Sequence, residues 1–233
     1  MAKRRRSTRA IGAAVVRRTT PQPAREPWRL PSLRFLVGAA AIVAVVAFVG
    51  LAFLSSSTAA AYNCEELLGA PAGASEGEAF STESLGSQHV TVGTRIRYGF
   101  CPPTSGSHYS AAGAGPLRPG FYGPGDAAGP GGWVHNLEHG YVVALYRCAD
   151  GNCPPEPELE ALRTFAANGP PTQAAAACGY RSKVLVARFD DLSTPFALVA
   201  WDRALLLDAF DPSIARDFAG RSLEATAPEP NAC

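Results

Sequence analysis

The longest apolar run of the chain lies near its N-terminus. Residues 35–54 read FLVGAAAIVAVVAFVGLAFL and contain no charged side chain over 20 positions. A helix of that length is about 30 Å long, which matches the hydrocarbon thickness of a bilayer. A core helix rarely lacks polar positions over such a length. The run therefore predicts a single transmembrane helix.

After this run, the apolar positions follow the shorter periods of strands and helices. The strand candidates are 94–100, 141–147, 184–189 and 196–201, and the helix candidates are 156–168 and 212–220. Turn-forming residues at 190–195 favour a hairpin between the last two strands. We therefore expect an α+β domain with a small antiparallel sheet, two or more helices and a long loop rich in glycine and proline, residues 101–132.

These patterns divide the chain into consecutive parts with different roles. In order they are a basic cytoplasmic tail (1–34), the transmembrane helix (35–54), a spacer with an irregular segment (55–88), an extracytoplasmic α+β domain (89–222) and a C-terminal tail (223–233). Only the fourth part has enough periodic segments to form a folded domain.

The distribution of charge gives this arrangement an orientation. Residues 1–34 carry ten Lys and Arg side chains against one acidic residue, whereas the chain after residue 61 carries 11 basic and 19 acidic residues, a net charge of −8. Basic residues beside a membrane helix stay in the cytoplasm, so we expect a single-pass protein of the cell membrane whose main domain lies outside the cytoplasm. A signal peptide cleaved near Ala59 and Ala61 is the alternative, but its basic and apolar parts would be unusually long. The acidic outer part disfavours nucleic acid as a partner.

All six cysteines follow the apolar run, at Cys64, Cys101, Cys148, Cys153, Cys178 and Cys233. An even number confined to the exported part is typical of disulfides formed in an oxidising compartment. The paired C-x-x-C spacing of a cysteine zinc site is absent. The sequence suggests only the pair Cys148–Cys153, because the intervening Ala-Asp-Gly-Asn is typical of a tight turn.

The histidines gather in or beside the long loop, at His89, His108, His135 and His139. The last two belong to the segment HNLEH, an H-x-x-E-H pattern. On a helix, residues four apart share a face, so both imidazoles could bind one metal ion with the carboxylate of Glu138 beside them. Inverted zinc-peptidase motifs have this order, with the glutamate as general base. On an extended strand, the two histidines would lie about 13 Å apart and could not share an ion.

Several segments around these histidines have the form of known family motifs. They are His-Val at 89–90, Tyr98, PPTSGSHY at 102–109, a G-x-Y element at 120–122, VHNLEHG at 134–140 before an apolar strand, and Ala-Trp at 200–201. In these segments, over residues 86–220, the chain resembles the bacterial domain-of-unknown-function family 3105. The family implies no established activity. The resemblance does place every histidine and Glu138 on a motif position, which favours a metal site built from separate segments.

We therefore expect the outer domain to bind a transition metal, zinc or copper, through His108, His135 and His139, with His89 as a fourth or more distant ligand. Glu138 would be a further ligand, or the general base if the domain is a zinc hydrolase with an open coordination position. Four histidine ligands would instead favour storage or structure. The alternative is a metal-free module of the cell envelope, whose histidines and prolines only shape a surface for an envelope protein or polymer.

Overall fold

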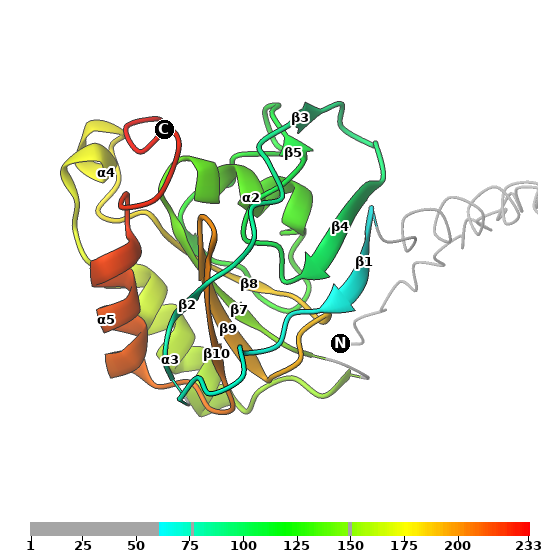
Figure 1. The fold of residues 1–233 in the computed structure, drawn as a ribbon. Helices are drawn as coiled ribbons and strands as arrows, with labels where there is room; N and C mark the ends of the chain where they lie inside the picture. The colour runs from blue at the N-terminus through cyan, green and yellow to red at the C-terminus, as the bar shows by residue number, and fades with distance from the viewer. Residues whose placement is uncertain (1–60, 76, 149–150) are drawn as a thin grey trace, which may run out of the picture. The chain divides into compact units, whose positions relative to one another are not determined.

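A six-stranded mixed sheet lies at the centre of the residues that the computed structural model describes, 61–75, 77–148 and 151–233 (Figure 1). Its strands lie in the order β2–β10–β9–β7–β8–β6. Their bounds are Phe80–Ser81 (β2), Gly120–Phe121 (β6), Val142–Tyr146 (β7), Val184–Arg188 (β8), Phe196–Ala200 (β9) and Arg203–Leu207 (β10). The strand candidates 141–147, 184–189 and 196–201 correspond to β7, β8 and β9.

The order of the strands differs from the predicted antiparallel arrangement. Strand β7 lies between β8 and β9, and it pairs parallel with β8 and antiparallel with β9. Strand β6 also pairs parallel with β8. The hairpin predicted around residues 190–195 is therefore wrong, because β7 is apolar on both faces and takes the central position between the two strands. The hairpin that forms joins β9 to β10 through a turn in which Asp202 has a φ of 53°.

The described ranges contain four helices, α2 (Pro130–Glu138), α3 (Glu156–Ala167), α4 (Gln173–Ala177) and α5 (Pro212–Ser222). Helices α3 and α5 confirm the candidates at 156–168 and 212–220. The side chain of Asp211 begins α5, because its carboxylate accepts hydrogen bonds from the backbone N–H groups of Ser213 and Ile214. The combination of helices with a mixed sheet confirms the α+β class, although the sheet is not purely antiparallel as predicted.

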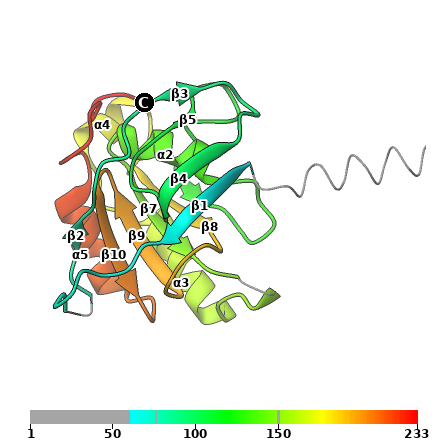
Figure 2. The same cartoon turned by 45° about the vertical axis from the view of Figure 1, so that its right-hand side comes forward.

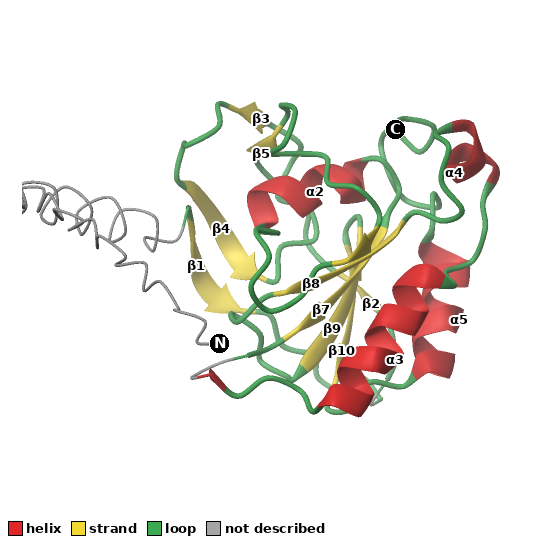
Figure 3. Ribbon diagram, turned by 180° about the vertical axis from the view of Figure 1, so that it is seen from behind, coloured by secondary structure: helices red, strands yellow, loops and turns green. Residues whose placement is uncertain are grey.

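Side chains of the central strands alternate between two hydrophobic cores, one on each face of the sheet. Along β7, Val143 and Leu145 pack in the core that includes α2, whereas Val142, Ala144 and Tyr146 pack in the core that includes α3 and α5. Figure 3 shows α2 on one side of the sheet and α3 and α5 on the other. Burial on both faces explains why these strands are continuous apolar runs rather than alternating ones.

Two short parallel pairs of strands lie beside the central sheet. Strand β1 (Tyr62–Leu67) pairs with β4 (Ile96–Cys101), which corresponds to the candidate 94–100. Strand β3 (His89–Val90) pairs with β5 (His108–Tyr109). Both pairs lie on the side of the sheet that carries α2 (Figure 2). The segment 55–88 is therefore not irregular throughout, because β1 and β2 lie within it.

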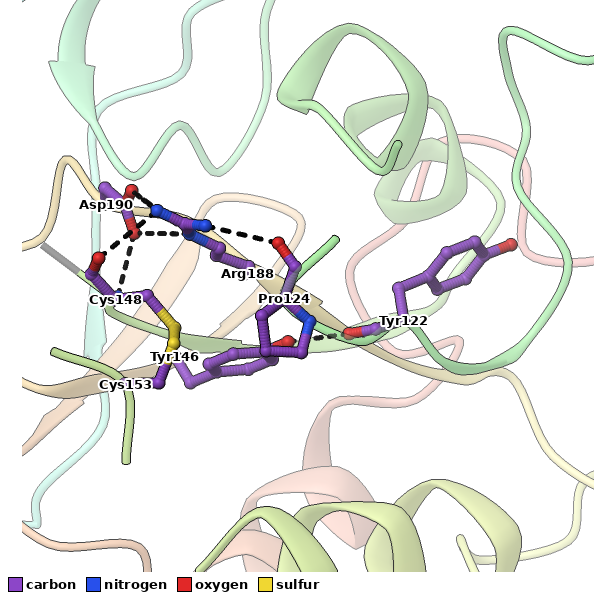
Figure 4. Close-up of a disulfide and its surroundings, with 7 residues drawn as sticks. All are labelled: Tyr122, Pro124, Tyr146, Cys148, Cys153, Arg188 and Asp190. Atoms are coloured by element: carbon purple, nitrogen blue, oxygen red, sulfur yellow. Dashed lines mark hydrogen bonds and ion pairs between the residues drawn. A yellow bond between two sulfur atoms is a disulfide. The ribbon is translucent and has the colours of Figure 1, made fainter. Parts of the chain in front are cut away.

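All six cysteines form disulfides, in the pairs Cys64–Cys101, Cys148–Cys153 and Cys178–Cys233. The first joins β1 to β4, and the second is the pair suggested by its intervening turn. Figure 4 shows the second pair at the end of β7, where the carboxylate of Asp190 accepts hydrogen bonds from the backbone N–H of Cys148 and from Arg188. The third ties the C-terminal residue to the end of α4.

Within the described ranges, no helix is both long and apolar enough to cross a bilayer. The predicted transmembrane helix at 35–54 and the basic tail at 1–34 lie outside the described residues, and both remain predictions.

Candidate metal centre

Two of the histidines lie side by side on the strand pair β3–β5. The register places the Cα of His89 opposite that of His108. Directly opposed residues of paired strands project from the same face, so both imidazoles leave the pair on one side. Their ring centres are 4.8 Å apart. His108 is fully buried, whereas half of the His89 side chain is exposed.

The buried segment before β5 fixes the backbone that carries His108. The hydroxyl oxygen of Ser105 accepts a hydrogen bond from the backbone N–H of Leu85 at 2.8 Å, and the N–H of Gly106 donates to the carbonyl of Gly86 at 2.6 Å. Gly106 has a φ of 117°, and a Cβ at this position would lie 3.1 Å from the Cβ of Leu85. Only glycine suits this turn, so the PPTSG motif has a positioning role for the histidine that follows.

Helix α2 positions the HNLEH segment. The helix ends at Glu138 with His139 at its C-cap, so His135 and His139 are four residues apart on helical backbone and not on a strand. Their Nε2 atoms are 3.1 Å apart. Gly140 follows with a φ of 83°, and its N–H bonds to the carbonyl of Leu137, which closes the helix.

Close contacts hold α2 against the neighbouring backbone. A Cβ at Gly131 would lie 2.5 Å from the ring of Tyr109, and the same atom at Gly132 would lie 2.6 Å from a carbonyl oxygen of the preceding loop. The side chain of Asn136 exchanges two hydrogen bonds with the backbone of Leu117, at 2.7 and 2.8 Å. These two glycines and Asn136 therefore place the helix, and the histidines and glutamate beside Asn136 supply the candidate ligands.

The strand pair and the helix together form a cluster of four candidate ligands, His89, His108, His135 and Glu138, whose ligand atoms all lie within 4.8 Å of one another. The Oε2 atom of Glu138 is 3.0 Å from Nε2 of His108 and 3.2 Å from Nε2 of His89. Ligand atoms on a tetrahedral zinc ion lie about 3.3 Å apart, because each bond is about 2.0–2.1 Å long. The cluster could therefore hold a metal ion with little movement.

The two buried histidines of this cluster are held by carbonyl oxygens. Nδ1 of His108 lies 2.7 Å from the carbonyl oxygen of Gly106, and Nδ1 of His135 lies 2.7 Å from that of Tyr109. A carbonyl only accepts hydrogen bonds, so each Nδ1 carries a proton and each Nε2 of a neutral ring carries a lone pair. Metal-binding histidines usually have such a partner on the nitrogen that faces away from the metal.

The contact between His108 and Glu138 needs a positive charge or a proton. With Nδ1 donating to Gly106, the lone pair of a neutral His108 faces a carboxylate oxygen at 3.0 Å, and two acceptors at that distance repel each other. A second proton on the imidazole, a proton on the carboxyl group, or a metal ion bound to both would each remove the repulsion. The cluster is therefore a site for a proton or for a metal cation.

Burial favours neutral imidazoles in the helix. It lowers the pKa of His135 to about 4, against the opposing effect of the hydrogen bond to Tyr109. Burial also lowers the pKa of His139, and the neighbouring Glu229 carboxylate opposes this shift. Both rings are therefore neutral near pH 7, which is the form that binds metal ions.

The predicted ligand His139 lies in a neighbouring group and not in the cluster of four. That group consists of Glu138, His139 and Glu229, whose ligand atoms also lie within 4.8 Å of one another. Nε2 of His139 is 3.7 Å from Oε2 of Glu229. Of the candidates, the structure thus brings His89, His108, His135 and Glu138 together, with Glu138 shared between the two groups.

Sequence reasoning did not identify Glu229 or the carbonyls that orient the histidines. Glu229 lies in a Pro-rich tail with no periodicity, far along the chain from His139. The carbonyl oxygens belong to Gly106 and Tyr109. Every residue has a backbone carbonyl, so the sequence cannot show which ones accept these hydrogen bonds. The positions of the histidines beside PPTSG and VHNLEHG were the only signal that pointed to this part of the molecule.

A family comparison covers the whole of this site. The model of the family described as protein of unknown function (DUF3105) matches residues 89–233, which include both groups of ligands and extend beyond residue 220 to the C-terminus. No curated protein and no solved structure matches the chain significantly. Because the match spans more than half of its length, the chain belongs to the DUF3105 family.

Proposed function

We propose that this domain binds a transition metal ion, zinc or copper, through His89, His108, His135 and Glu138. The observation that carries the proposal is the arrangement of the two buried histidines. Each has its Nδ1 committed to a carbonyl oxygen and its Nε2 lone pair in the cluster that contains Glu138. A metal ion would satisfy these lone pairs and the carboxylate charge together.

The chemistry of the ligands favours zinc or copper over other metals. Three imidazoles and one carboxylate are a borderline donor set that suits Zn²⁺ and Cu²⁺, whereas Mg²⁺ and Ca²⁺ prefer oxygen ligands alone. All six cysteines are in disulfides, so thiolates do not contribute to the site. Cu²⁺ binds such ligands more tightly than Zn²⁺ in general, so the metal retained after purification distinguishes the two.

Glu138 fits the role of a ligand better than that of a general base. Its Oε2 lies within 3.2 Å of two imidazole nitrogens, and its side chain is only 6% exposed. A base for hydrolysis needs room for a water molecule between itself and the metal-bound substrate. The exposed half of His89 is the side from which an ion could enter. We therefore place metal binding before hydrolysis.

We further propose that the domain works outside the cytoplasm, tethered to the cell membrane by residues 35–54. The support is the excess of basic residues before the apolar run, and the oxidised state of all six cysteines after it. An extracytoplasmic metal-binding domain would take its ion from the cell envelope. Its partner in this proposal is a protein or polymer of the envelope.

Metal content of the full-length chain tests the main proposal. Purified in detergent without chelator, the protein should contain zinc or copper by mass spectrometry, and the metal-free form should regain the ion when Zn²⁺ is added. His89→Ala is the informative variant, because this side chain is half exposed and its loss leaves the core intact. It should weaken zinc binding about tenfold or more.

Gln88→Ala is the matched control, since Gln88 is exposed and immediately precedes His89 in the chain. This variant should bind zinc like the unaltered protein. A protein without bound metal that also fails to take up Zn²⁺ or Cu²⁺ would contradict the proposal. It would then favour the metal-free interaction module, with a proton between His108 and Glu138.

A further inference from the structure

We infer that the centre holds two metal ions, with Glu138 as a shared ligand and with the second ion bound by His139 and Glu229. This inference rests on the proposed function, because the first ion is the one held by His89, His108, His135 and Glu138. The segment 224–233, here called the C-terminal strap, supplies the second carboxylate. The ligand class for the second position is a divalent transition metal cation.

His139 is not required as a ligand of the first ion. Three imidazoles and Glu138 complete a tetrahedral set, and His139 is not part of that cluster. Its side chain is only 10% exposed, and its Nε2 atom lies 3.7 Å from Oε2 of Glu229. Its Nε2 atom lies 3.1 Å from Nε2 of His135. A buried neutral imidazole whose ligand atom lies within 4.8 Å of two carboxylates is suited to bind a cation together with them.

The C-terminal strap is built to hold Glu229 beside His139. The last carbonyls of a helix have no partner within it. At the end of α2 the N–H of Glu229 donates to the carbonyl of Glu138, and the N–H of Glu224 donates to that of Gly140, both at 3.0 Å. The strap therefore completes the hydrogen bonding of α2, and its backbone cannot shift without breaking these bonds.

Further contacts fix the strap on both sides of Glu229. The ammonium group of Lys183 donates to the carbonyls of Pro230 and Ala232, at 2.7 and 3.0 Å, and the Cys178–Cys233 disulfide anchors the end of the chain. The Glu229 side chain is 57% exposed and is not part of any of these anchors. Its carboxylate is thus free to bind a ligand while its backbone is held.

The shared carboxylate and the charges suit two neighbouring ions. A carboxylate has two oxygens and can bridge two metals, which lie about 3.5–4 Å apart in two-metal sites. Glu138 belongs to both groups of ligands, and its side chain is buried at their junction. Glu138 and Glu229 together offset half of the charge of two divalent ions, and the neutral imidazoles accept the remainder by coordination.

Zinc stoichiometry of the full-length protein tests this inference. The metal-free chain, titrated with Zn²⁺ and followed by isothermal calorimetry and by mass spectrometry, should bind two ions. Glu229→Gln removes the charge of an exposed side chain, so the variant should fold and should bind one ion. Glu224→Gln is the matched control, because this strap carboxylate contacts Thr172 and Lys183 and lies outside both groups. It should still bind two ions.

The outcomes separate this inference from the proposed function. No bound zinc in the unaltered protein would overturn both. One ion in the unaltered protein, or two ions in Glu229→Gln, would overturn the second site and leave the first. Loss of one ion in Glu224→Gln as well would show that docking of the strap, and not the Glu229 carboxylate, is responsible.

A copper spectrum tests the shared ligand separately. With two equivalents of Cu²⁺, the electron paramagnetic resonance spectrum should show magnetic coupling between the two ions. A spectrum that is the sum of two isolated Cu²⁺ signals would exclude Glu138 as a shared ligand.

Discussion

A buried cation joins the end of helix α2 to the C-terminal strap. Lys183 is fully buried, and its ammonium group donates hydrogen bonds to the carbonyls of His139, Pro230 and Ala232 at 2.7 to 3.0 Å. Burial lowers its pKa, and the Glu224 carboxylate, 3.8 Å away, opposes this effect. A charge in such a position is tolerated only when its hydrogen bonds are complete.

We expect Lys183→Met to lower the free energy of unfolding by about 3 kcal/mol, because it leaves one buried and two partly buried carbonyls without their donor. Urea denaturation of the variant and of the unaltered protein measures the difference. Arg181→Met is the control, since Arg181 is exposed and lies two residues earlier. It should change stability by less than about 0.5 kcal/mol. Equal effects of the two variants would show that the Lys183 network contributes little.

The carboxylate of Asp190 should make stability depend on pH in the acid range. Hydrogen bonds from Arg188, and then from the N–H of Cys148, hold its pKa below the usual value (Figure 4). Because the pKa of this carboxyl group is lower in the folded protein than in the unfolded chain, the carboxylate stabilises the fold at pH values above its pKa in the unfolded chain, about 3.9. This stabilisation is lost as the pH falls through the pKa of the folded protein. The stability difference between the unaltered protein and Asp190→Asn should therefore be larger at pH 7 than at pH 3. A difference that does not shrink in acid would contradict this assignment.

At the scale of elements, α2 must lie very close to β5 for the histidines to meet. A Cβ at Gly131 would lie 2.5 Å from Cε2 of Tyr109, whose carbonyl orients His135. Gly131→Ala should therefore destabilise the domain by about 1–3 kcal/mol and weaken zinc binding, because Tyr109 must move. Gly125→Ala is the control, since no atom lies within 4 Å of its Cβ position. Thermal unfolding and zinc titration of both variants test the prediction, and equal behaviour would contradict it.

The elements that could be predicted from the sequence are those with a clear local period. Helices α3 and α5 have apolar residues three or four apart, and β7 to β9 are apolar runs of strand length, so each was predicted within about two residues. Strand β10, residues Arg203–Leu207, was not among the strand candidates, because only two residues separate it from the end of β9. The short strands β3 and β5 contain two residues each, which is too few for any period.

The order of strands and the membership of the site depend on contacts between distant segments. Turn residues at 190–195 show that the chain reverses, but they do not show that β7 separates β8 from β9. The H-x-x-E-H spacing likewise predicted His135 and His139 as a pair, and their Nε2 atoms do lie close together. The spacing could not show that the register between β3 and β5 also sets His89 and His108 beside Glu138. Such pairings have no local signature, because they are decided by which apolar faces can be buried together.

At the scale of the whole molecule, the membrane topology is the first prediction. The tail 1–34 should lie in the cytoplasm and the domain after residue 61 outside it, because of the basic residues that precede the apolar run. Alkaline phosphatase, which is active only outside the cytoplasm, should be active when fused after Cys233. Green fluorescent protein, which folds poorly when exported through the general secretion pathway, serves as the opposite reporter. Fluorescence without phosphatase activity would show that the domain after residue 61 lies in the cytoplasm.

The Cys178–Cys233 disulfide connects the stability of the domain to the second metal position. It closes a sequence separation of 55 residues, against 5 for Cys148–Cys153, so its removal frees many more conformations of the unfolded chain. Chain entropy predicts a loss of about 4 kcal/mol for the double variant Cys178→Ser/Cys233→Ser and about 2 kcal/mol for Cys148→Ser/Cys153→Ser. Urea denaturation measures both.

The two variants should also differ in zinc binding. Without its terminal anchor, the C-terminal strap keeps its hydrogen bonds to Lys183, Thr172, Trp201 and the end of α2, but its last residues are no longer tied to α4. Glu229 is then held less firmly beside His139. Cys178→Ser/Cys233→Ser should therefore bind the second zinc ion more weakly while the first is unchanged, because the ligands of the first lie on β3, β5 and α2. Cys148→Ser/Cys153→Ser should bind both ions as the unaltered protein does, since this pair lies at the end of β7 and contributes nothing to either group. Calorimetric titration resolves the two binding events. Equal loss of both ions in Cys178→Ser/Cys233→Ser would show that the strap supports the whole centre and not the second position alone.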